Sequence, residues 1–220
     1  KRVRVLFAGR TVAHSTRVLL LRESGCVPVY YFPFADIDKS LLRLTNHTTY
    51  CPFKGEASYW TVTADGRKAG NALWTYPEPF AEAAGIQDHG GFYWNAMDAW
   101  LEEDEEVFVH ARDPKVRVDV RLSHRLVKVT IGGDMVAETE NARFLFETGL
   151  PTRYYIPAED VRMDCLTGSE TRTACPYKGE ARYYHARIGD KTHEDIAWFY
   201  PAPVPDCPGV KGLIAFYHEK

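Results

Sequence analysis

The stretch Cys51-Pro52-Phe53-Lys54-Gly55-Glu56-Ala57 recurs as Cys175-Pro176-Tyr177-Lys178-Gly179-Glu180-Ala181, an offset of 124 residues in a chain of 220. The same offset, without a gap, matches residues far outside the heptapeptide, and chance does not keep one register over so long a stretch. The matches include Gly9 and Gly133, Glu23 and Glu147, Gly25 and Gly149, Tyr30-Tyr31 and Tyr154-Tyr155, Pro33 and Pro157, and Trp74 and Trp198. The sequence therefore predicts two homologous domains of roughly a hundred residues each, an ordinary domain size.

Each copy is predicted to be mainly β. Residues 3–8 alternate apolar and basic side chains, as a half-buried strand does, and residues 11–21 are expected to continue as a second strand. Pro33 and Pro157 open segments, 35–42 and 158–166, that we expect to be helical because proline suits a first helical turn. We assign residues 1–93 to the first repeat and 126–220 to the second.

Residues 94–125 join the two copies. Their first part, 95–106, is acidic and places Met97, Trp100 and Leu101 on one face of a predicted helix, and the remainder alternates like strands. This linker is too apolar for a loose tether. We therefore expect a packed segment that fixes one lobe against the other within a monomer, with the lobes related by a pseudo-twofold axis.

Composition excludes several classes of protein. The chain has 27 Lys and Arg against 30 Asp and Glu, with a formal net charge of −3 and no basic run, which disfavours nucleic-acid binding. No apolar stretch approaches the roughly 20 residues of a membrane span, and no signal peptide is recognisable. The five cysteines form no CxxC pair, which argues against structural zinc and a disulfide framework. We expect a cytoplasmic protein without a metal or other cofactor.

The repeated motif supplies candidate catalytic residues. A nearby lysine could favour the thiolate of Cys51 or Cys175, although neither has a histidine base at matching positions, and a small buried plug at a turn is the alternative interpretation. Residues two apart in a strand share a face, so the motif's lysine and glutamate are predicted to stand side by side as a surface salt bridge or an acid/base couple. The candidates are Cys51, Lys54, Glu56, Cys175, Lys178 and Glu180.

Aromatic residues supply candidate ligand-binding positions. Most must belong to the core, because a small lobe depends on large side chains for burial. A minority could form a cage for a planar or cationic small molecule. The candidates are Tyr31, Trp74 and Tyr76 in the first copy and Tyr155, Trp198 and Tyr200 in the second.

The chain resembles a known bacterial and fungal family. The resemblance rests on the two CPxKGE elements, on Phe146-Glu147-Thr148-Gly149-Leu150-Pro151, on Arg153-Tyr154-Tyr155-Ile156-Pro157, and on the linker word His110-Ala111-Arg112-Asp113-Pro114. The family is the domain of unknown function numbered 427, here as a tandem pair. The resemblance implies a small antiparallel fold similar to the β-tent domains of methionine sulfoxide reductase B and cereblon. Many of those bind zinc through two CxxC pairs, which this chain lacks.

Three functions stay open at this point. The family is nominally labelled nucleotidyltransferase-like, but the sequence has neither a Gly-Ser motif with paired carboxylates nor a phosphate-cradling loop. The first hypothesis is an enzyme acting on a small molecule through a Cys/Lys/Glu cleft. The second is a non-catalytic module that binds a small ligand in an aromatic pocket. The third is a structural or interaction protein.

Overall fold

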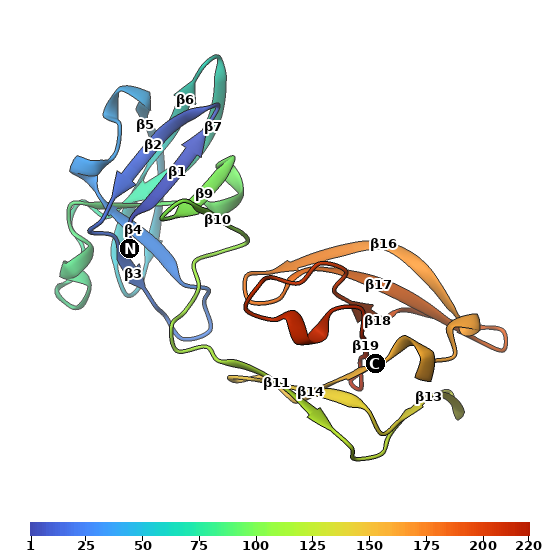
Figure 1. Cartoon of the computed structure of the whole chain (residues 1–220). Coiled ribbons are helices and arrows are strands. Elements are labelled where there is room, and N and C mark those ends of the chain that lie inside the picture. Colours follow the sequence, from blue (N-terminus) through green and yellow to red (C-terminus); the bar gives the residue numbers. More distant parts are fainter. The chain divides into compact units, whose positions relative to one another are not determined.

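The chain folds into two compact units, and the computed structural model describes all of residues 1–220 (Figure 1). Lys1–Asp113 forms the N-terminal lobe and Pro114–Lys220 forms the C-terminal lobe. Both lobes are built from antiparallel strands with a few short 3₁₀ turns, so the predicted mainly-β tandem architecture is confirmed. No helix has the length and apolarity that a bilayer crossing requires.

A six-stranded antiparallel sheet recurs in both lobes. Its order in the N-terminal lobe is β3-β4-β8-β7-β6-β5, and the C-terminal lobe repeats it as β14-β15-β19-β18-β17-β16. The first set comprises β3 (Leu19–Leu21), β4 (Val29–Pro33), β5 (Leu42–Cys51), β6 (Gly55–Ala64), β7 (Arg67–Thr75) and β8 (His89–Phe92). The second comprises β14 (Ala142–Glu147), β15 (Arg153–Ile156), β16 (Leu166–Cys175), β17 (Gly179–Ile188), β18 (Lys191–Phe199) and β19 (Ile214–Phe216).

Each repeat also opens with a bulged hairpin. In the N-terminal lobe β1 (Val3–Phe7) pairs with β2 (Arg10–Ser15), and in the C-terminal lobe β12 (Val127–Ile131) pairs with β13 (Asp134–Thr139). The register shifts at equivalent positions, between Val5 and Leu6 and between Val129 and Thr130. The 124-residue repeat therefore preserves strand order and bulge position alike.

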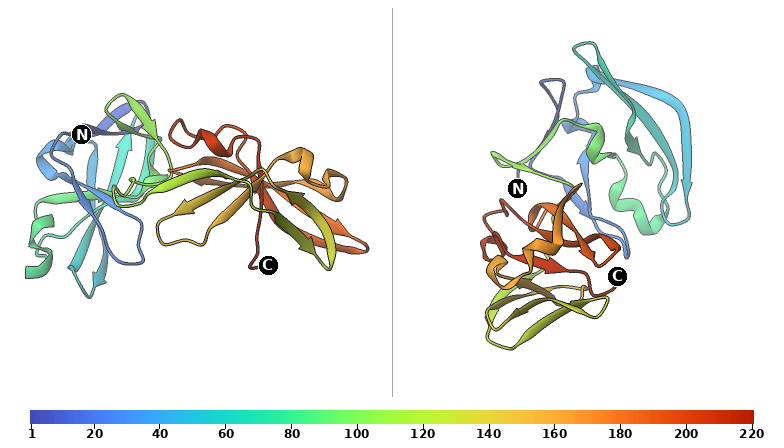
Figure 2. Two further views of the ribbon diagram at one scale, coloured as in Figure 1. Left: turned by 60° about the horizontal axis from the view of Figure 1, so that its bottom comes forward. Right: turned by 90° about the vertical axis from the view of Figure 1, so that its right-hand side faces the viewer.

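The segment between the repeats supplies different strands to the two lobes (Figure 2). β9 (Ala99–Glu102) and β10 (Glu105–Val107) extend the first hairpin, giving the order β10-β9-β1-β2. β11 (Val118–Ser123) instead pairs with β14 and gives the C-terminal sheet a seventh strand. The linker thus extends the hairpin sheet of the N-terminal lobe and the six-stranded sheet of the C-terminal lobe.

The helix predicted for residues 95–106 is wrong. Only Trp94–Ala96 forms a 3₁₀ turn, η4, and the rest is β9 and β10. The reason is tertiary packing: Trp100 lies opposite Val5 in the β1–β9 ladder and stacks on Trp94, with ring centroids 4.3 Å apart and planes 5° apart. A buried aromatic stack with a sheet partner outweighs a weak helical pattern.

The two segments predicted after the prolines are short 3₁₀ turns, not α-helices. Each is divided in two, as η1 (Phe34–Asp36) with η2 (Lys39–Leu41) and η5 (Ala158–Asp160) with η6 (Met163–Cys165). A hydroxyl group on the preceding hairpin holds the first turn of each pair in place. Ser15 Oγ donates to Asp36 in η1, and Thr139 Oγ1 donates to Asp160 in η5, both at 2.6 Å. The remaining turns are η3 (Ala81–Ile86) and η7 (Pro208–Val210).

Each six-stranded sheet has a core on both faces. In the N-terminal lobe one cluster, which includes Phe32 and Trp100, fills the space under the β1–β2 hairpin. The other cluster contains Tyr31, Tyr59 and Tyr76 and packs against η3. Consecutive residues of β4, Tyr31 and Phe32, enter different clusters because a strand alternates its side chains between faces. The repeated motif lies beside the second cluster.

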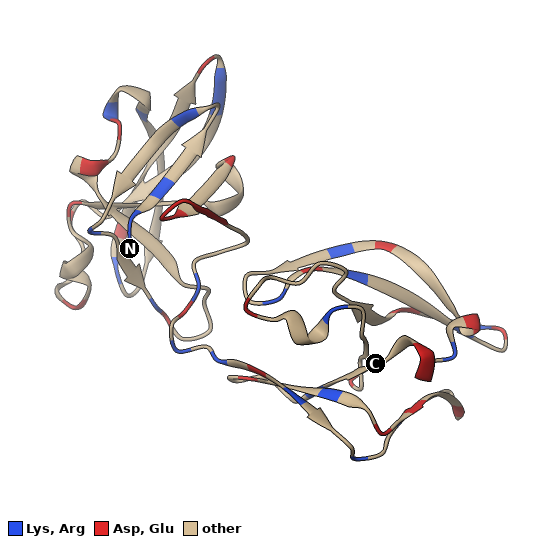
Figure 3. Ribbon diagram, viewed as in Figure 1, with Lys and Arg blue, Asp and Glu red and all other residues tan.

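Charged residues of both signs are interspersed in each lobe (Figure 3). Basic and acidic side chains pair locally, for example Arg67 with Asp98 at 2.7 Å and Arg153 with Glu219 at 2.7 Å.

Candidate functional site

The repeated motif is a hairpin turn. Cys51 ends β5, Gly55 begins β6, and the two residues pair across the turn. The Lys54 N–H donates to the Cys51 carbonyl at 3.3 Å, and the Lys54 carbonyl accepts from the Phe80 N–H at 3.2 Å. The second copy repeats both hydrogen bonds, from Lys178 to Cys175 at 3.3 Å and from Val204 to Lys178 at 3.1 Å. The motif therefore ties the β-hairpin to the loop that follows β7 or β18.

The backbone conformation of this turn requires glycine. Gly55 has φ +98° and Gly179 has φ +108°, a region that side chains with a Cβ rarely adopt. A Cβ on Gly55 would lie 3.2 Å from the Glu78 carbonyl, and one on Gly179 would lie 3.1 Å from the Ala202 carbonyl. Folding alone is thus a sufficient reason for the repetition of this glycine.

The lysine of the motif is paired with a distant glutamate. Lys54 Nζ donates to Glu23 Oε1 at 2.6 Å, and Lys178 makes the equivalent ion pair with Glu147. The predicted pairing of Lys54 with Glu56 is wrong, because Lys54 lies in the turn, where the two-residue alternation of a strand does not hold.

The motif's glutamates point away from the lysines. Glu56 is exposed, while its neighbours Gly55 and Ala57 are buried. Glu180 is likewise exposed and lies near Arg172 and Arg182, at 3.6 and 3.8 Å. The structure therefore does not bring the predicted acid/base couple together in either lobe.

Cys51 packs beside the lysine at the edge of the aromatic cluster. Burial disfavours its thiolate, but the backbone N–H groups of Phe53 and Lys54 and the Lys54 ammonium outweigh burial and lower the pKa of Cys51. Burial also disfavours the charged Lys54, yet Glu23 and Cys51 together raise its pKa. Cys175 occupies the matching, partly buried position in the C-terminal lobe.

The predicted cage residues of each lobe lie together in a largely buried cluster. In the N-terminal lobe the Trp74 indole N–H donates to the Tyr31 hydroxyl at 2.7 Å, with the rings edge to face at 86°. Trp198 and Tyr155 repeat the arrangement at 3.1 Å and 86°. Tyr31, Tyr76, Tyr155, Trp198 and Tyr200 are buried. These five rings belong to the core, whereas Trp74 is partly exposed.

Burial keeps the cluster tyrosines protonated. Desolvation is the largest cause of the raised pKa of Tyr31 and Tyr155, and it also raises the pKa of Tyr76 and Tyr200. Tyr93 lies at the margin of the cluster, 4.8 Å from the Trp74 ring, and burial raises its pKa to about 12. The cluster therefore provides neutral hydrogen-bonding groups at ordinary pH.

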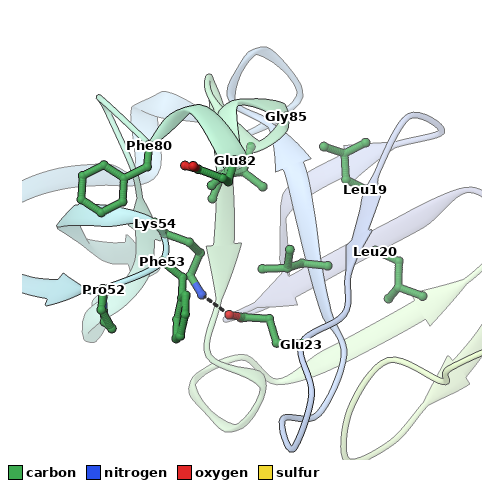
Figure 4. Close-up of a pocket in the computed structure, with 12 residues that line it drawn as sticks. Leu19, Leu20, Glu23, Pro52, Phe53, Lys54, Phe80, Glu82 and Gly85 are labelled. Atoms are coloured by element: carbon green, nitrogen blue, oxygen red, sulfur yellow. Dashed lines mark hydrogen bonds and ion pairs between the residues drawn. The ribbon is translucent and has the colours of Figure 1, made fainter.

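An open groove lies next to this cluster in the N-terminal lobe. It encloses about 920 Å³ between β3 and the loop that carries η3. Figure 4 shows Leu19, Leu20 and Glu23 on one side and Pro52, Phe53 and Phe80 on the other, with the Lys54–Glu23 ion pair spanning between them. Leu21, Glu82, Ala83, Gly85 and Ile86 complete the lining. We call this the β3–η3 groove.

Of the predicted site residues, only Lys54 lines the β3–η3 groove. Sequence reasoning missed Glu23, the leucines of β3 and the residues of η3. One signal was present, because Glu23 and Gly25 match Glu147 and Gly149 at the repeat offset. Leu21 also matches Leu145 at this offset, whereas Leu19 and Leu20 gave no such signal, since they match Arg143 and Phe144.

The matching surface of the C-terminal lobe is covered by β11. Val118 and Val120 pack onto the cluster that contains Leu145 and Val210. The ion pair is correspondingly shielded: the Glu147 side chain is 8% exposed, against 34% for Glu23. The groove is therefore open in one lobe and filled by the chain's own strand in the other.

Comparison with protein-family models decides the family. The model described as a domain of unknown function (DUF427) matches residues 1–103 and again residues 119–220. This chain belongs to the DUF427 family. The two DUF427 segments together cover nearly the whole chain and correspond to the two lobes. A search of curated proteins finds no match.

Proposed function

We propose that this DUF427 protein is a non-catalytic binding module whose ligand lies in the β3–η3 groove of the N-terminal lobe. The observation that carries the proposal is the groove itself, an open hollow of about 920 Å³ with mostly apolar walls and one ion pair. Binding sites are typically concave and largely apolar, with a few polar groups that orient the ligand. An exposed apolar hollow on a soluble lobe is otherwise unfavourable.

The distribution of polar groups favours binding over chemistry. An acid/base or nucleophilic mechanism needs its groups to converge on one reacting atom. Here Glu56 and Glu180 lie on the exposed face, and Cys51 is not part of the groove lining. Lys54 is engaged by Glu23, so it serves better as a fixed polar contact than as a proton donor.

The lining also defines the class of ligand. Leucine, phenylalanine and isoleucine side chains supply an apolar surface. The Glu23 side chain is 34% exposed beside Lys54, which leaves room for a donor on the ligand. A mainly apolar ligand with hydrogen-bond donors along one side fits this arrangement, whereas an anionic ligand would have to break the Lys54–Glu23 pair.

Filling the groove tests the proposal. Gly85 lines the groove, has no atom within 4 Å of its Cβ position and does not have a positive φ, so Gly85→Leu is expected to fold normally. We expect a neutral apolar fluorophore such as N-phenyl-1-naphthylamine to bind the wild-type chain and to bind Gly85→Leu about tenfold more weakly. Gly70→Leu, at an equally open position on β7 outside the groove, is the matched control.

Equal fluorophore binding by the wild type and both variants would disprove a site in this groove. Thermal-shift screening of small organic ligands against the same three proteins extends the test. Ligands of this site should stabilise the wild type and Gly70→Leu but not Gly85→Leu.

A further inference from the structure

The outermost strand of the six-stranded sheet differs between the lobes. β3 and β14 occupy the same place in the sheet order, and both pair on their inner side with the next strand, β4 or β15. On its outer side β14 pairs with β11, whereas β3 ends the N-terminal sheet. An exposed strand edge carries unpaired backbone N–H and C=O groups that can accept a further strand.

In the C-terminal lobe, β11 shows how such a strand is held. It runs antiparallel to β14, with Val118 opposite Glu147 and Val120 opposite Leu145. Val118 and Val120, two residues apart and therefore on one face, pack onto the aromatic cluster. Val120 sits directly over η7, because a Cβ placed on Gly209 would lie 2.9 Å from its Cγ1 atom.

In the N-terminal lobe the same space is open. Gly85 is equivalent to Gly209 at the repeat offset, yet nothing lies within 4 Å of its Cβ position. Leu21 is only half-buried, whereas its equivalent Leu145 is 1% exposed. The space that Val120 of β11 occupies in the C-terminal lobe is therefore open in the N-terminal lobe.

We propose that the β3–η3 groove takes an extended segment of another polypeptide, which adds to β3 as an antiparallel strand. This deepens the proposed function by naming the ligand class of that same groove, and it rests on that function. The segment should carry aliphatic side chains at alternate positions, as Val118 and Val120 do in β11. Backbone hydrogen bonds would supply affinity and the alternate side chains would supply specificity.

The chain provides its own probe. A fluorescein-labelled peptide with the sequence of residues 116–123, Val-Arg-Val-Asp-Val-Arg-Leu-Ser, is titrated with the full 220-residue protein while anisotropy is recorded. We expect saturable binding that Gly85→Leu weakens at least about tenfold and Gly70→Leu leaves unchanged. Backbone amide signals of Leu19–Leu21 and Glu23 should shift in the NMR spectrum, while those of β14 should not, because β11 already covers that strand.

Two altered peptides separate strand addition from simple apolar contact. Replacing the two valines that correspond to Val118 and Val120 with aspartate should weaken binding at least about tenfold. Methylating alternate backbone nitrogens should do the same, because it removes hydrogen bonds to the β3 edge and leaves the side chains intact. Unchanged binding of the methylated peptides would overturn the proposal.

The remaining outcomes also decide between the two proposals. If the peptide neither binds nor displaces the fluorophore while the fluorophore still discriminates Gly85→Leu from the wild type, strand addition is wrong and the groove binds something else. If neither probe binds, both proposals fail. NMR shifts confined to β14 would likewise overturn the assignment to β3.

Discussion

The lysine of the repeated motif owes its environment to a glutamate 31 residues earlier in the chain. The pair is built identically in the two lobes but is shielded differently, since Glu23 is 34% exposed and Glu147 is 8% exposed. A buried carboxylate that loses its partner must either stay charged where water cannot solvate it or take up a proton, which costs several kcal/mol, whereas a partly exposed one is still solvated by water.

We therefore expect Lys178→Met to destabilise the protein by about 3–5 kcal/mol and Lys54→Met by clearly less, about 1–2 kcal/mol. Urea denaturation followed by tryptophan fluorescence and by NMR signals from each lobe measures both changes. Glu56→Ala is the control, expected within about 0.5 kcal/mol of wild type because Glu56 is exposed. Equal losses for the two lysine variants would show that the difference in exposure has no energetic effect.

Cys51 should titrate at a lower pH than an unperturbed thiol, which has a pKa of about 8.5. The Phe53 and Lys54 N–H groups and the Lys54 ammonium stabilise its thiolate against the effect of burial. The rate of alkylation by iodoacetamide, followed residue by residue by mass spectrometry, should therefore show an inflection below that value. In Lys54→Met the inflection should move upward, because burial remains and the ammonium is gone.

Lys68→Met, which removes an exposed lysine from β7, is the control and should leave the inflection unchanged. The exposed Cys26 reports general thiol accessibility in the same samples. An identical inflection in wild type and Lys54→Met would show that the lysine does not act on the thiol.

At the scale of elements, the motif acts as a hairpin turn whose glycine permits an unusual backbone. Gly55→Ala and Gly179→Ala should each destabilise the protein by about 1–3 kcal/mol, through a positive φ and a close carbonyl contact. Gly70→Ala, also in a β-hairpin strand but with open space and no positive φ, should be neutral or slightly stabilising. Melting temperatures of the three variants check this, and a neutral Gly55→Ala would refute the argument.

Sequence patterns predicted the apolar strands well and the polar ones poorly. The strand expected at residues 3–8 is β1, and the strand expected at residues 11–21 is divided into β2 and β3. β5 and β16 were missed because most of their residues are exposed, so no apolar alternation marks them. Their pairing with β6 and β17 is a tertiary property that a local pattern does not record.

The contacts of the candidate site were harder to predict, because they too depend on tertiary structure. The repeat identified the turn that holds Cys51 and Lys54, because identity at a fixed offset is visible in the sequence alone. It did not reveal that Lys54 turns toward Glu23 and away from Glu56. That choice depends on the path of the chain between β3 and β4, which sets Glu23 beside the turn.

At the scale of the whole molecule, the two copies share one fold and differ in which strands of the linker pair with them. β9 fills the space beside β1 in the N-terminal lobe, and the matching region of the C-terminal lobe is a hollow of about 570 Å³ lined by residues of β12, β14 and β19. β11 fills the space beside β14, and the matching region of the N-terminal lobe is the β3–η3 groove. The duplicated fold thus provides two strand-sized positions per lobe, and the linker fills one in each.

The folding unit is therefore larger than the repeat. Fragment 1–113 retains β9, whose Trp100 is 2% exposed in the core, and fragment 114–220 retains β11 over Leu145. Both fragments should fold with cooperative thermal transitions and dispersed NMR spectra. Fragments 1–93 and 126–220, cut at the limits of the repeat, lose these strands and should melt at least about 10 °C lower or remain unfolded, because removing one buried tryptophan alone costs about 3–5 kcal/mol.

Supplying the missing strand provides the control for that experiment. A peptide with the sequence of residues 116–123, added to fragment 126–220, should raise its melting temperature in a concentration-dependent way, because it restores the seventh strand beside β14. Fragment 114–220, which already carries β11, should not respond to the same peptide. If the fragments cut at the repeat limits are as stable as the longer ones, the linker strands add nothing to either lobe, and the precedent that β11 offers for strand addition at β3 loses its energetic basis.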